Sequence, residues 1–190
     1  MAIRLITTPL SHDRNPTYTL FNTAWGWMGF ACRATRLCRV ILPGLSKSSI
    51  LTIFHSEWPA IKYSRNLLPA LGESLVDFFQ GKAATFECNV DISWSSPFAR
   101  RVYQACARLK PGQTTTYSEL AQKAGSAKAA RVVGSIMAAN RTPLIIPCHR
   151  VLRSDGKLGG YSAAGGLVLK KRLIIHESKI ETENLHDFNT

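Results

Sequence analysis

The sequence predicts two domains of different fold class, a mixed α/β half followed by a helical half that contains a helix-turn-helix. Residues 18–42 and 85–92 are rich in the aromatic and β-branched residues that are typical of strands. From Ser96 onward, apolar residues instead recur at the spacing of amphipathic helices. We place the boundary between residues 95 and 96, which gives domains 1–95 and 96–190.

The first half is expected to hold a hairpin, a helix and a further strand. Residues 18–31 and 37–42 are predicted to pair across the basic turn at residues 33–36, and Pro43-Gly44 ends this pattern. Residues 85–92 are predicted to form another strand. An amphipathic helix is predicted over residues 67–80, with Gly81 as its stop and apolar residues at Leu68, Leu71, Leu75, Val76 and Phe79.

The second half is expected to be mostly helical. A helix should begin at Ser96-Pro97 and continue to about Leu109, before Pro111-Gly112. Thr116 or Ser118 should cap a short helix over residues 119–123, and a helix of mostly small residues should follow Gly125-Ser126 over residues 127–139. Two short helices joined by a glycine-containing turn are typical of a helix-turn-helix. Small residues let a helix lie close to another surface, such as a DNA groove, and they equally suit tight packing in a core. Both roles remain open for the second helix.

The positive charge is confined to one part of the chain. Residues 97–172 hold 14 Lys and Arg but only 2 Asp and Glu, which accounts for the whole net charge of +12. A basic half beside a neutral half indicates a polyanionic partner, with the phosphates of a nucleic acid as the leading candidate. The alternative is a solubilising surface without a partner.

Composition excludes several classes of protein. Hydrophobic residues make up 45% and charged residues 19% of the chain, which is the balance of a globular protein. No apolar run approaches the roughly 18 residues needed to cross a bilayer, and the apolar start is too short for a secretory signal. The five cysteines are odd in number and no pair reads C-x-x-C, which argues against a disulfide framework. We therefore expect a soluble intracellular protein with reduced thiols.

Cys148 stands in a setting that is unusual for a packing cysteine. It follows the apolar run 144–146 and lies between Pro147 and His149. A nucleophilic sulfur needs a base or a positive field to reach the thiolate state. On extended backbone, neighbouring side chains point to opposite faces, so we expect His149 to act on the thiol through one water. Glu177 is a candidate for the carboxylate that orients this histidine.

The string Pro147-Cys148-His149-Arg150-Val151, preceded by Asn140 and Ile145-Ile146, resembles the active-site signature of the O6-alkylguanine-DNA alkyltransferases (methylated-DNA–protein-cysteine methyltransferases). The resemblance extends in the right order over residues 97–177, through 116–121, 124–125, 128–134, 159–162 and 165–167. Over the first half there is only a general likeness. The resemblance implies an N-terminal ribonuclease-H-like α/β domain and a C-terminal helix-turn-helix domain of winged-helix-like type.

The resemblance also implies an activity. The chain would be a DNA repair enzyme, a methylated-DNA–[protein]-cysteine S-methyltransferase that moves an alkyl group from O6 of guanine irreversibly onto its own cysteine and acts once. Its partner would be double-stranded DNA containing O6-alkylguanine, bound through the minor groove with the damaged base flipped out. We expect no cofactor, metal, nucleotide or membrane partner, and a monomer in solution. The location would be cytoplasmic and nucleoid-associated in a prokaryote, or nuclear in a eukaryote.

The family's functional residues can be carried onto matching positions. By the resemblance, Cys148 is the nucleophile, His149 and Glu177 draw its proton through water, and Tyr117 donates a proton to N3 of guanine. Asn140 holds the turn that carries the cysteine. Arg131 takes the vacated place in the base stack. Small side chains let the recognition helix enter the groove at Ala129, Ala130 and Gly134; the guanine pocket is formed by Met137 and Pro143 as apolar walls, Tyr161 and Ser162 at O6, and backbone acceptors at Cys148 and Val151.

Several alternatives stay open from the sequence. A structural zinc in the first half would need Cys32, Cys38, Cys88 and His55 to converge, and the family's ligand pattern is not clearly reproduced. Three rival functions are a damage-binding protein of the same fold, a helix-turn-helix regulator and a cysteine hydrolase. The first would lack Cys148, the second would not need Tyr117, and the third would not need a basic helix-turn-helix.

Overall fold

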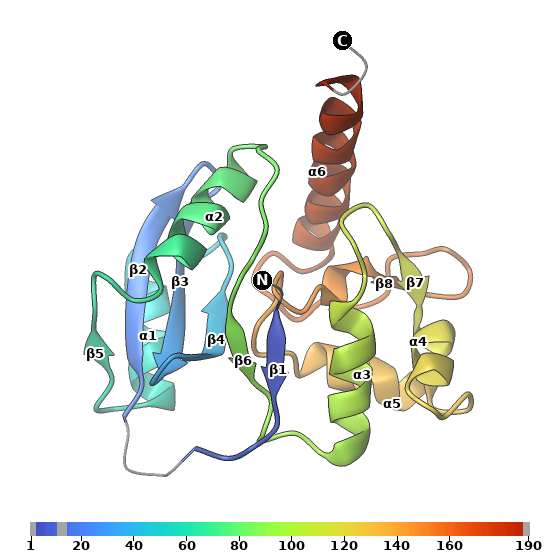
Figure 1. Cartoon of the computed structure of the whole chain (residues 1–190), viewed down its shortest axis with the longest axis horizontal. Helices are drawn as coiled ribbons and strands as arrows, with labels where there is room; N and C mark the ends of the chain where they lie inside the picture. The colour runs from blue at the N-terminus through green and yellow to red at the C-terminus, as the bar shows by residue number, and fades with distance from the viewer. Residues whose placement is uncertain (1–2, 11–14, 188–190) are drawn as a thin grey trace. The chain divides into compact units, whose positions relative to one another are not determined.

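The computed structural model describes residues 3–10 and 15–187, with side chains to residue 180. It divides into two compact units, Met1–Trp94 and Ser95–Thr190 (Figure 1). Among the described helices, none combines the length and the apolarity required to cross a bilayer.

The first unit is a six-stranded mixed sheet with strand order β1-β6-β4-β3-β2-β5. The central strands β2, β3 and β4 pair antiparallel, whereas β1, β5 and β6 join in parallel. The strands are β1 (Arg4–Ile6), β2 (Thr17–Thr23), β3 (Gly26–Arg33), β4 (Arg36–Ile41), β5 (Lys62–Tyr63) and β6 (Asn89–Asp91).

Two helices, α1 (Lys47–Glu57) and α2 (Pro69–Phe79), cover opposite faces of this sheet (Figure 1). Ile50 and Phe54 of α1 pack in one core cluster with Tyr18 and Ala31 from β2 and β3. Side chains alternate along a strand, so Phe30 lies on the other face. The two layers explain why β3 is buried over most of its length.

The predicted hairpin forms between β3 and β4, which pair across the basic turn between Arg33 and Arg36, but its first strand was predicted too long. Residues 18–31 do not form one strand, because the chain reverses between Thr23 and Gly26 and makes the separate strands β2 and β3. The Thr23 hydroxyl donates to the Gly26 carbonyl at 2.8 Å and accepts from the Trp25 N–H at 3.2 Å. Gly26 has φ +111°, which glycine adopts without strain. The turn signal is therefore a side-chain hydrogen bond rather than a Pro or Asn-Gly pair.

Other element boundaries also differ. α2 begins at Pro69 rather than at residue 67, because Leu68 has the left-handed φ of +44°. The strand predicted over 85–92 is reduced to β6. Helix α1 was not predicted; its sequence carries little helical periodicity, and Ser46 begins it by accepting from the Ser49 N–H at 3.1 Å.

The second unit is mostly helical. Its elements are α3 (Pro97–Ala107), β7 (Thr115–Thr116), α4 (Tyr117–Lys123), α5 (Ala130–Ala138), the 3-10 turn η1 (Cys148–Arg150), β8 (Val151–Leu152) and α6 (Gly166–Asp187). Strands β7 and β8 form a short parallel pair. Helix α4 packs on α5, and α6 contacts η1.

Helices α4 and α5 form the expected helix-turn-helix. Thr116, rather than Ser118, caps α4, and it exchanges hydrogen bonds with Glu119 at 3.1 and 2.8 Å in a capping box. Gly125 turns the chain with φ +86°. α5 starts at Ala130, three residues later than predicted, because residues 126–129 form a turn. The Tyr103 hydroxyl of α3 donates to the Ile136 carbonyl at 3.0 Å and so fixes α5 on the core.

Candidate active site

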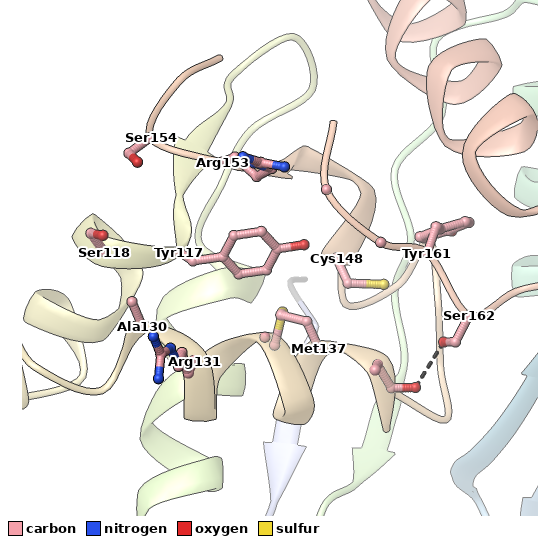
Figure 2. A pocket seen from close by; sticks show the side chains of 14 residues that line it. Tyr117, Ser118, Ala130, Arg131, Met137, Cys148, Arg153, Ser154, Tyr161 and Ser162 are labelled. Atoms are coloured by element: carbon pink, nitrogen blue, oxygen red, sulfur yellow. Dashed lines mark hydrogen bonds between the residues drawn. The ribbon is translucent and has the colours of Figure 1, made fainter. Parts of the chain in front are cut away.

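A cleft of about 1050 Å³ opens within the second unit, beside the helix-turn-helix. Figure 2 shows the Cys148 sulfur facing this cleft, with the Tyr117 hydroxyl pointing toward it from α4. The other residues that line it are Ser118, Ala130, Arg131, Gly134, Met137, Ala138, Arg153, Ser154, Gly159, Gly160, Tyr161 and Ser162. The cleft therefore joins one buried sulfur to the side of α5 that carries Arg131.

The cysteine is presented by a series of turns. The Cys148 N–H donates to the Ile146 carbonyl at 2.8 Å, and Pro147 between them has φ −80° and ψ +63°, the dihedrals of an inverse γ-turn. The 3-10 turn η1 begins at Cys148. The expectation of extended backbone at Cys148 and His149 was thus wrong. Proline favours the γ-turn because its ring already fixes φ.

Asn140 connects this turn to the sulfur. Its Nδ2 donates to the Ile146 carbonyl at 2.8 Å and to Cys148 Sγ at 3.1 Å, while its Oδ1 accepts from the Thr142 N–H at 3.0 Å. Asn140 is buried, so each of these bonds replaces one that water would otherwise supply. These bonds connect Asn140 to both ends of the turn from Ile146 to Cys148.

The thiol is tuned by opposing effects. Burial raises the pKa of Cys148, and the hydrogen bond from Asn140, the charge of Lys170 and the nearby Tyr161 hydroxyl each act to lower it. Only 5% of Cys148 is exposed to solvent. The thiol is therefore largely protonated at rest, and a group that takes its proton is needed.

His149, Glu177 and Arg150 form a buried network behind the cysteine. His149 Nε2 lies 2.8 Å from Glu177 Oε1. Arg150 donates from Nε and Nη2 to the two oxygens of Glu177 at 2.9 and 2.7 Å, and from Nη1 to the Leu109 carbonyl at 2.6 Å. Among the described residues, His149 Nδ1 is buried without a hydrogen-bond partner. Its Nδ1 is therefore free to take part in proton transfer.

This network has a defined protonation state. Burial favours a higher pKa for Glu177, but the hydrogen bonds and charges of His149 and Arg150 outweigh it and hold the pKa at about 2. Burial lowers the pKa of His149, which Glu177 only partly offsets. At neutral pH the pair is a neutral imidazole hydrogen-bonded to a carboxylate, the state that can accept a proton.

The helix-turn-helix supplies the other side of the cleft. Burial raises the pKa of Tyr117, followed by the effect of Cys148, so its hydroxyl keeps its proton. Figure 2 shows Met137 on α5 below this ring and Arg131 with Ala130 nearer the start of that helix. Arg131 is exposed.

Tyr161 and Ser162 close the cleft from the loop before α6. Burial, and then the neighbouring Cys148, raise the pKa of Tyr161 well above its usual value. The Ser162 hydroxyl donates to the Ala138 carbonyl at 2.7 Å, the dashed bond in Figure 2. A contact between this hydroxyl and a guanine O6 would require the hydroxyl to rotate.

Three of the residues predicted to contact DNA or the guanine base do not line the cleft. Ala129 precedes α5 as its N-cap, and Pro143 is buried in the turn that pairs with Ile146, so the expected apolar wall at Pro143 is absent from this cleft. Val151 is buried in β8, and its carbonyl accepts from Lys170 Nζ at 2.6 Å. Met137, the other residue predicted as an apolar wall, does line the cleft.

Two important charges were missed by sequence reasoning. Arg150 was noted only as part of a motif, although it binds both oxygens of Glu177. Lys170 was not considered, yet its side chain is fully buried. A helical projection of α6 would have found it, since Lys170 falls on the same face as Leu173 and Glu177.

The residues considered for zinc do not form a metal site. Among the described residues, no group of three or more His, Cys, Asp and Glu side chains is arranged to hold a metal ion. The Cys38 thiol instead donates to the Ala31 carbonyl at 3.2 Å, and the His55 ring packs edge-on against Tyr18. These contacts do not fit a zinc ligand set.

Comparison with known proteins gives a consistent result. Residues 97–179 match the family described as "6-O-methylguanine DNA methyltransferase, DNA binding domain". The chain is 38% identical over 107 residues to the methylated-DNA–protein-cysteine methyltransferase of Salmonella typhimurium, covering 56% of this chain and 61% of that protein. It is 36% identical over 117 residues to the Mycolicibacterium paratuberculosis protein of the same name, covering 62% of this chain and 69% of the relative.

The fold also matches a solved structure. The crystal structure of Mycobacterium tuberculosis OGT in complex with DNA aligns with a TM-score of 0.70 at 25% identity, covering 86% of this chain and 94% of the other. The chain thus shares an N-terminal mixed sheet with helices and a C-terminal helical DNA-binding domain with that protein. The matched sequence spans about three fifths of the Salmonella relative's length. Together with the cysteine turn and its cleft, these matches show that the chain belongs to the methylated-DNA–protein-cysteine methyltransferase (O6-alkylguanine-DNA alkyltransferase) family.

Proposed function

We propose that this chain repairs O6-alkylguanine in double-stranded DNA by taking the alkyl group onto Cys148. The observation that carries this is the position of the sulfur. It faces a cleft lined by the helix-turn-helix, with Asn140 Nδ2 at 3.1 Å and the Tyr117 hydroxyl directed toward it. A hydrolase for carbonyl substrates would have no need for a DNA-binding helix beside its nucleophile.

Base flipping follows from this arrangement. Cys148 is buried, with 5% of the residue exposed, so its sulfur cannot reach an O6 substituent inside a stacked duplex. The cleft is large enough for one extruded purine. Arg131, exposed at the rim on α5, would fill the gap left in the stack while Ala130 and Gly134 let the helix approach the minor groove.

The transfer is a displacement at the alkyl carbon. Cys148 loses its proton through a water to His149, whose positive charge Glu177 stabilises. The thiolate then forms the sulfur–carbon bond as the bond between that carbon and O6 breaks. The electron pair remains on guanine, and Tyr117 donates a proton at N3 so that a neutral base leaves. The Tyr117 proton is replaced by the proton taken from the thiol, and the sum is thiol plus alkylguanine giving thioether plus guanine.

The thioether ends the protein's activity. A thioether is stable because a thiolate is a poor leaving group from an alkyl carbon, and the nucleophiles among the residues that line the cleft are neutral hydroxyl groups. The protein would therefore act once. No cofactor enters any step of this reaction.

The finer assignments belong to the same proposal. The N-terminal sheet would be ribonuclease-H-like, and β7 and β8 beside α4 and α5 would make the C-terminal unit winged-helix-like. The protein would act as a monomer on the minor groove. Its place of action would be the bacterial nucleoid or, in a eukaryote, the nucleus. The DNA complex of the M. tuberculosis relative supports a DNA partner.

A titration of damaged duplex with protein tests this function. We expect each protein molecule to remove one O6-methyl group from a synthetic duplex, after which fresh duplex is not repaired. Cys148→Ser should remove none and still bind duplex. Cys88→Ser should behave as the wild type, because burial raises the pKa of that thiol to about 12 and it lies in the other unit. Repeated turnover, or loss of repair in Cys88→Ser, would contradict the proposal.

A further inference from the structure

Lys170 lies behind the reactive cysteine with no contact with solvent. It belongs to α6, and its side chain is 0% exposed. Its Nζ donates to the Val151 carbonyl at 2.6 Å and lies 5.7 Å from the centroid of the Tyr117 ring. The ammonium group thus reaches both β8, which directly follows the cysteine turn, and the aromatic ring that faces the sulfur.

A buried ammonium group is costly. Removal of a charge from water is unfavourable unless another group compensates it. No carboxylate pairs with Lys170 among the residues that the structure describes. The neighbouring buried positions of α6 on this face are Leu169 and Leu173, so an apolar side chain would be the simpler choice for packing. A lysine at this buried position therefore indicates a role for its charge.

The charge that can compensate this ammonium forms on the sulfur when the Cys148 thiol ionises. The Lys170 charge is one of the effects that lower the pKa of Cys148, and Cys148 in turn acts to raise the pKa of Lys170, which burial brings down to about 8. The two groups stabilise each other only when the lysine is an ammonium and the cysteine is a thiolate. Such coupling is reciprocal by necessity.

We propose that Lys170 is a positioning residue of the transfer reaction: its buried ammonium holds the Val151 carbonyl against the cysteine turn and favours the thiolate form of Cys148. This inference rests on the proposed function for its biological meaning. The charge coupling itself can be tested without any DNA.

Other titratable groups surround this cluster. Those that face it are Tyr103 and Cys106 of α3, Tyr117 of α4, His149 of η1, Tyr161 of the preceding loop and Glu177 of α6. Burial raises the pKa values of the two α3 groups and of both tyrosines at the cleft, so these four stay neutral below pH 9. Arg150 binds both oxygens of Glu177. Lys170 is therefore the group expected to change charge near pH 8 beside the thiol.

The test uses a small neutral electrophile. The rate of Cys148 alkylation by iodoacetamide is measured against pH, by mass spectrometry of the Cys148 peptide, for wild type, Lys170→Met and Lys171→Met. Lys171 is the adjacent lysine of the same helix and is exposed, so its replacement removes the same charge without touching the cluster. Below the thiol pKa the rate follows the thiolate fraction, so a tenfold fall in that fraction slows alkylation about tenfold.

We expect Lys170→Met to react about tenfold more slowly than wild type at pH 7.5, with the rates converging at high pH. Lys171→Met should follow the wild-type curve. An equal slowing at every pH would mean a structural role and would overturn the proposal, as would a Lys170→Met profile that coincides with wild type. Lys170→Arg, if it keeps the charge beside the thiol, should restore part of the rate at pH 7.5.

A reciprocal measurement protects the test against poor folding of the lysine variants. Lysine carbons labelled at Cε allow the Lys170 titration to be followed by NMR in wild type and in Cys148→Ser. Without the thiolate, Lys170 should lose its proton at a lower pH. Identical titration in the two proteins would overturn the proposed coupling. Failure of methyl transfer with a normal iodoacetamide result would instead count against the proposed function alone.

Discussion

His149 and Glu177 are joined by a 2.8 Å hydrogen bond between Nε2 and Oε1, both in side chains that solvent does not reach. This bond links the residue beside the nucleophile to the middle of α6 across 28 positions of the chain. Arg150 binds the same carboxylate from the other side. The network therefore serves both the proton path and the attachment of α6 to the cysteine turn.

Replacement of the Glu177 carboxylate should change how the free energy of unfolding depends on pH. The pKa of Glu177 is held at about 2, below its usual 4.5, so the ionised group contributes stability above pH 4.5 that is lost as pH falls toward 2. The full contribution is on the order of 3 kcal/mol. His149 acts in the same direction, because burial lowers its pKa and the unfolded chain takes up that proton below pH 6.5.

We expect Glu177→Gln to lower the free energy of unfolding at pH 7 and to flatten its dependence on pH below 4.5. Urea unfolding at a series of pH values measures both effects. Asp155→Asn, which removes an exposed carboxylate of the same unit, should leave the curve unchanged. A Glu177→Gln curve parallel to wild type between pH 5 and 3 would show that the network does not set the protonation state.

Asn140 offers a separation of fold from chemistry. Asn140→Ala removes two hydrogen bonds that Asn140 donates and one that it accepts, all with buried partners. We therefore expect stability to fall by about 1–3 kcal/mol and alkyl transfer to become slower than in wild type. Asn140→Asp keeps the acceptor for the Thr142 N–H but gives the sulfur a negative neighbour. The Asn140→Asp variant should reach a given rate of alkyl transfer only at a higher pH than wild type. Normal transfer by Asn140→Asp at pH 7 would contradict the role given to the bond between Nδ2 and Sγ.

Arg131 should matter only when the base must leave a stack. Flipping costs a few kcal/mol in duplex DNA and nothing for the free base. We therefore expect Arg131→Ala to slow repair of duplex about tenfold or more, while reaction with free O6-methylguanine changes little. Lys128→Ala, an exposed basic residue just before α5, is the control for lost charge. Equal slowing on both substrates would reject the stack-filling role.

Two adjacent glycines of the cleft predict its selectivity. A Cβ at Gly159 would lie 3.0 Å from the Tyr117 hydroxyl oxygen, and its φ of +64° disfavours other residues, whereas a Cβ at Gly160 would meet nothing within 4 Å. Gly159→Ala should therefore slow transfer of a benzyl group more than transfer of a methyl group. Gly160→Ala should leave their ratio as in wild type. Rates on the two substrates are compared by quenched single-turnover assays.

The C-terminal unit was predicted from the sequence better than the N-terminal one. Helical periodicity predicted α3, α4 and α5, and the first two also begin at side-chain caps, Ser96 and Thr116. In the first unit, the turn at Thr23 contains no Pro or Asn-Gly pair in its sequence. Helix α1 has the N-cap Ser46 as its one sequence signal. Register and short parallel strands such as β1 and β5 depend on contacts distant in sequence, which local patterns do not contain.

The site shows the same limit at the level of single residues. The family resemblance assigned Cys148, Tyr117, Arg131 and Met137 to the site, because each stands at a recognisable position of a helix or turn. All four line one cleft. Lys170 and Arg150 were missed as functional charges, since their roles depend on burial against partners far along the chain. Pro143 does not line the cleft, because it is buried in the turn where it pairs with Ile146.

The central claim is that the alkyl group ends on one sulfur. Wild-type protein is incubated with a duplex that contains O6-methylguanine, digested, and the peptide that holds Cys148 is weighed by mass spectrometry. We expect a gain of one methyl group on that peptide and unmodified Cys32, Cys38, Cys88 and Cys106. A protein that binds the duplex while the Cys148 peptide keeps its original mass, or a methyl group found on another residue, would contradict this claim.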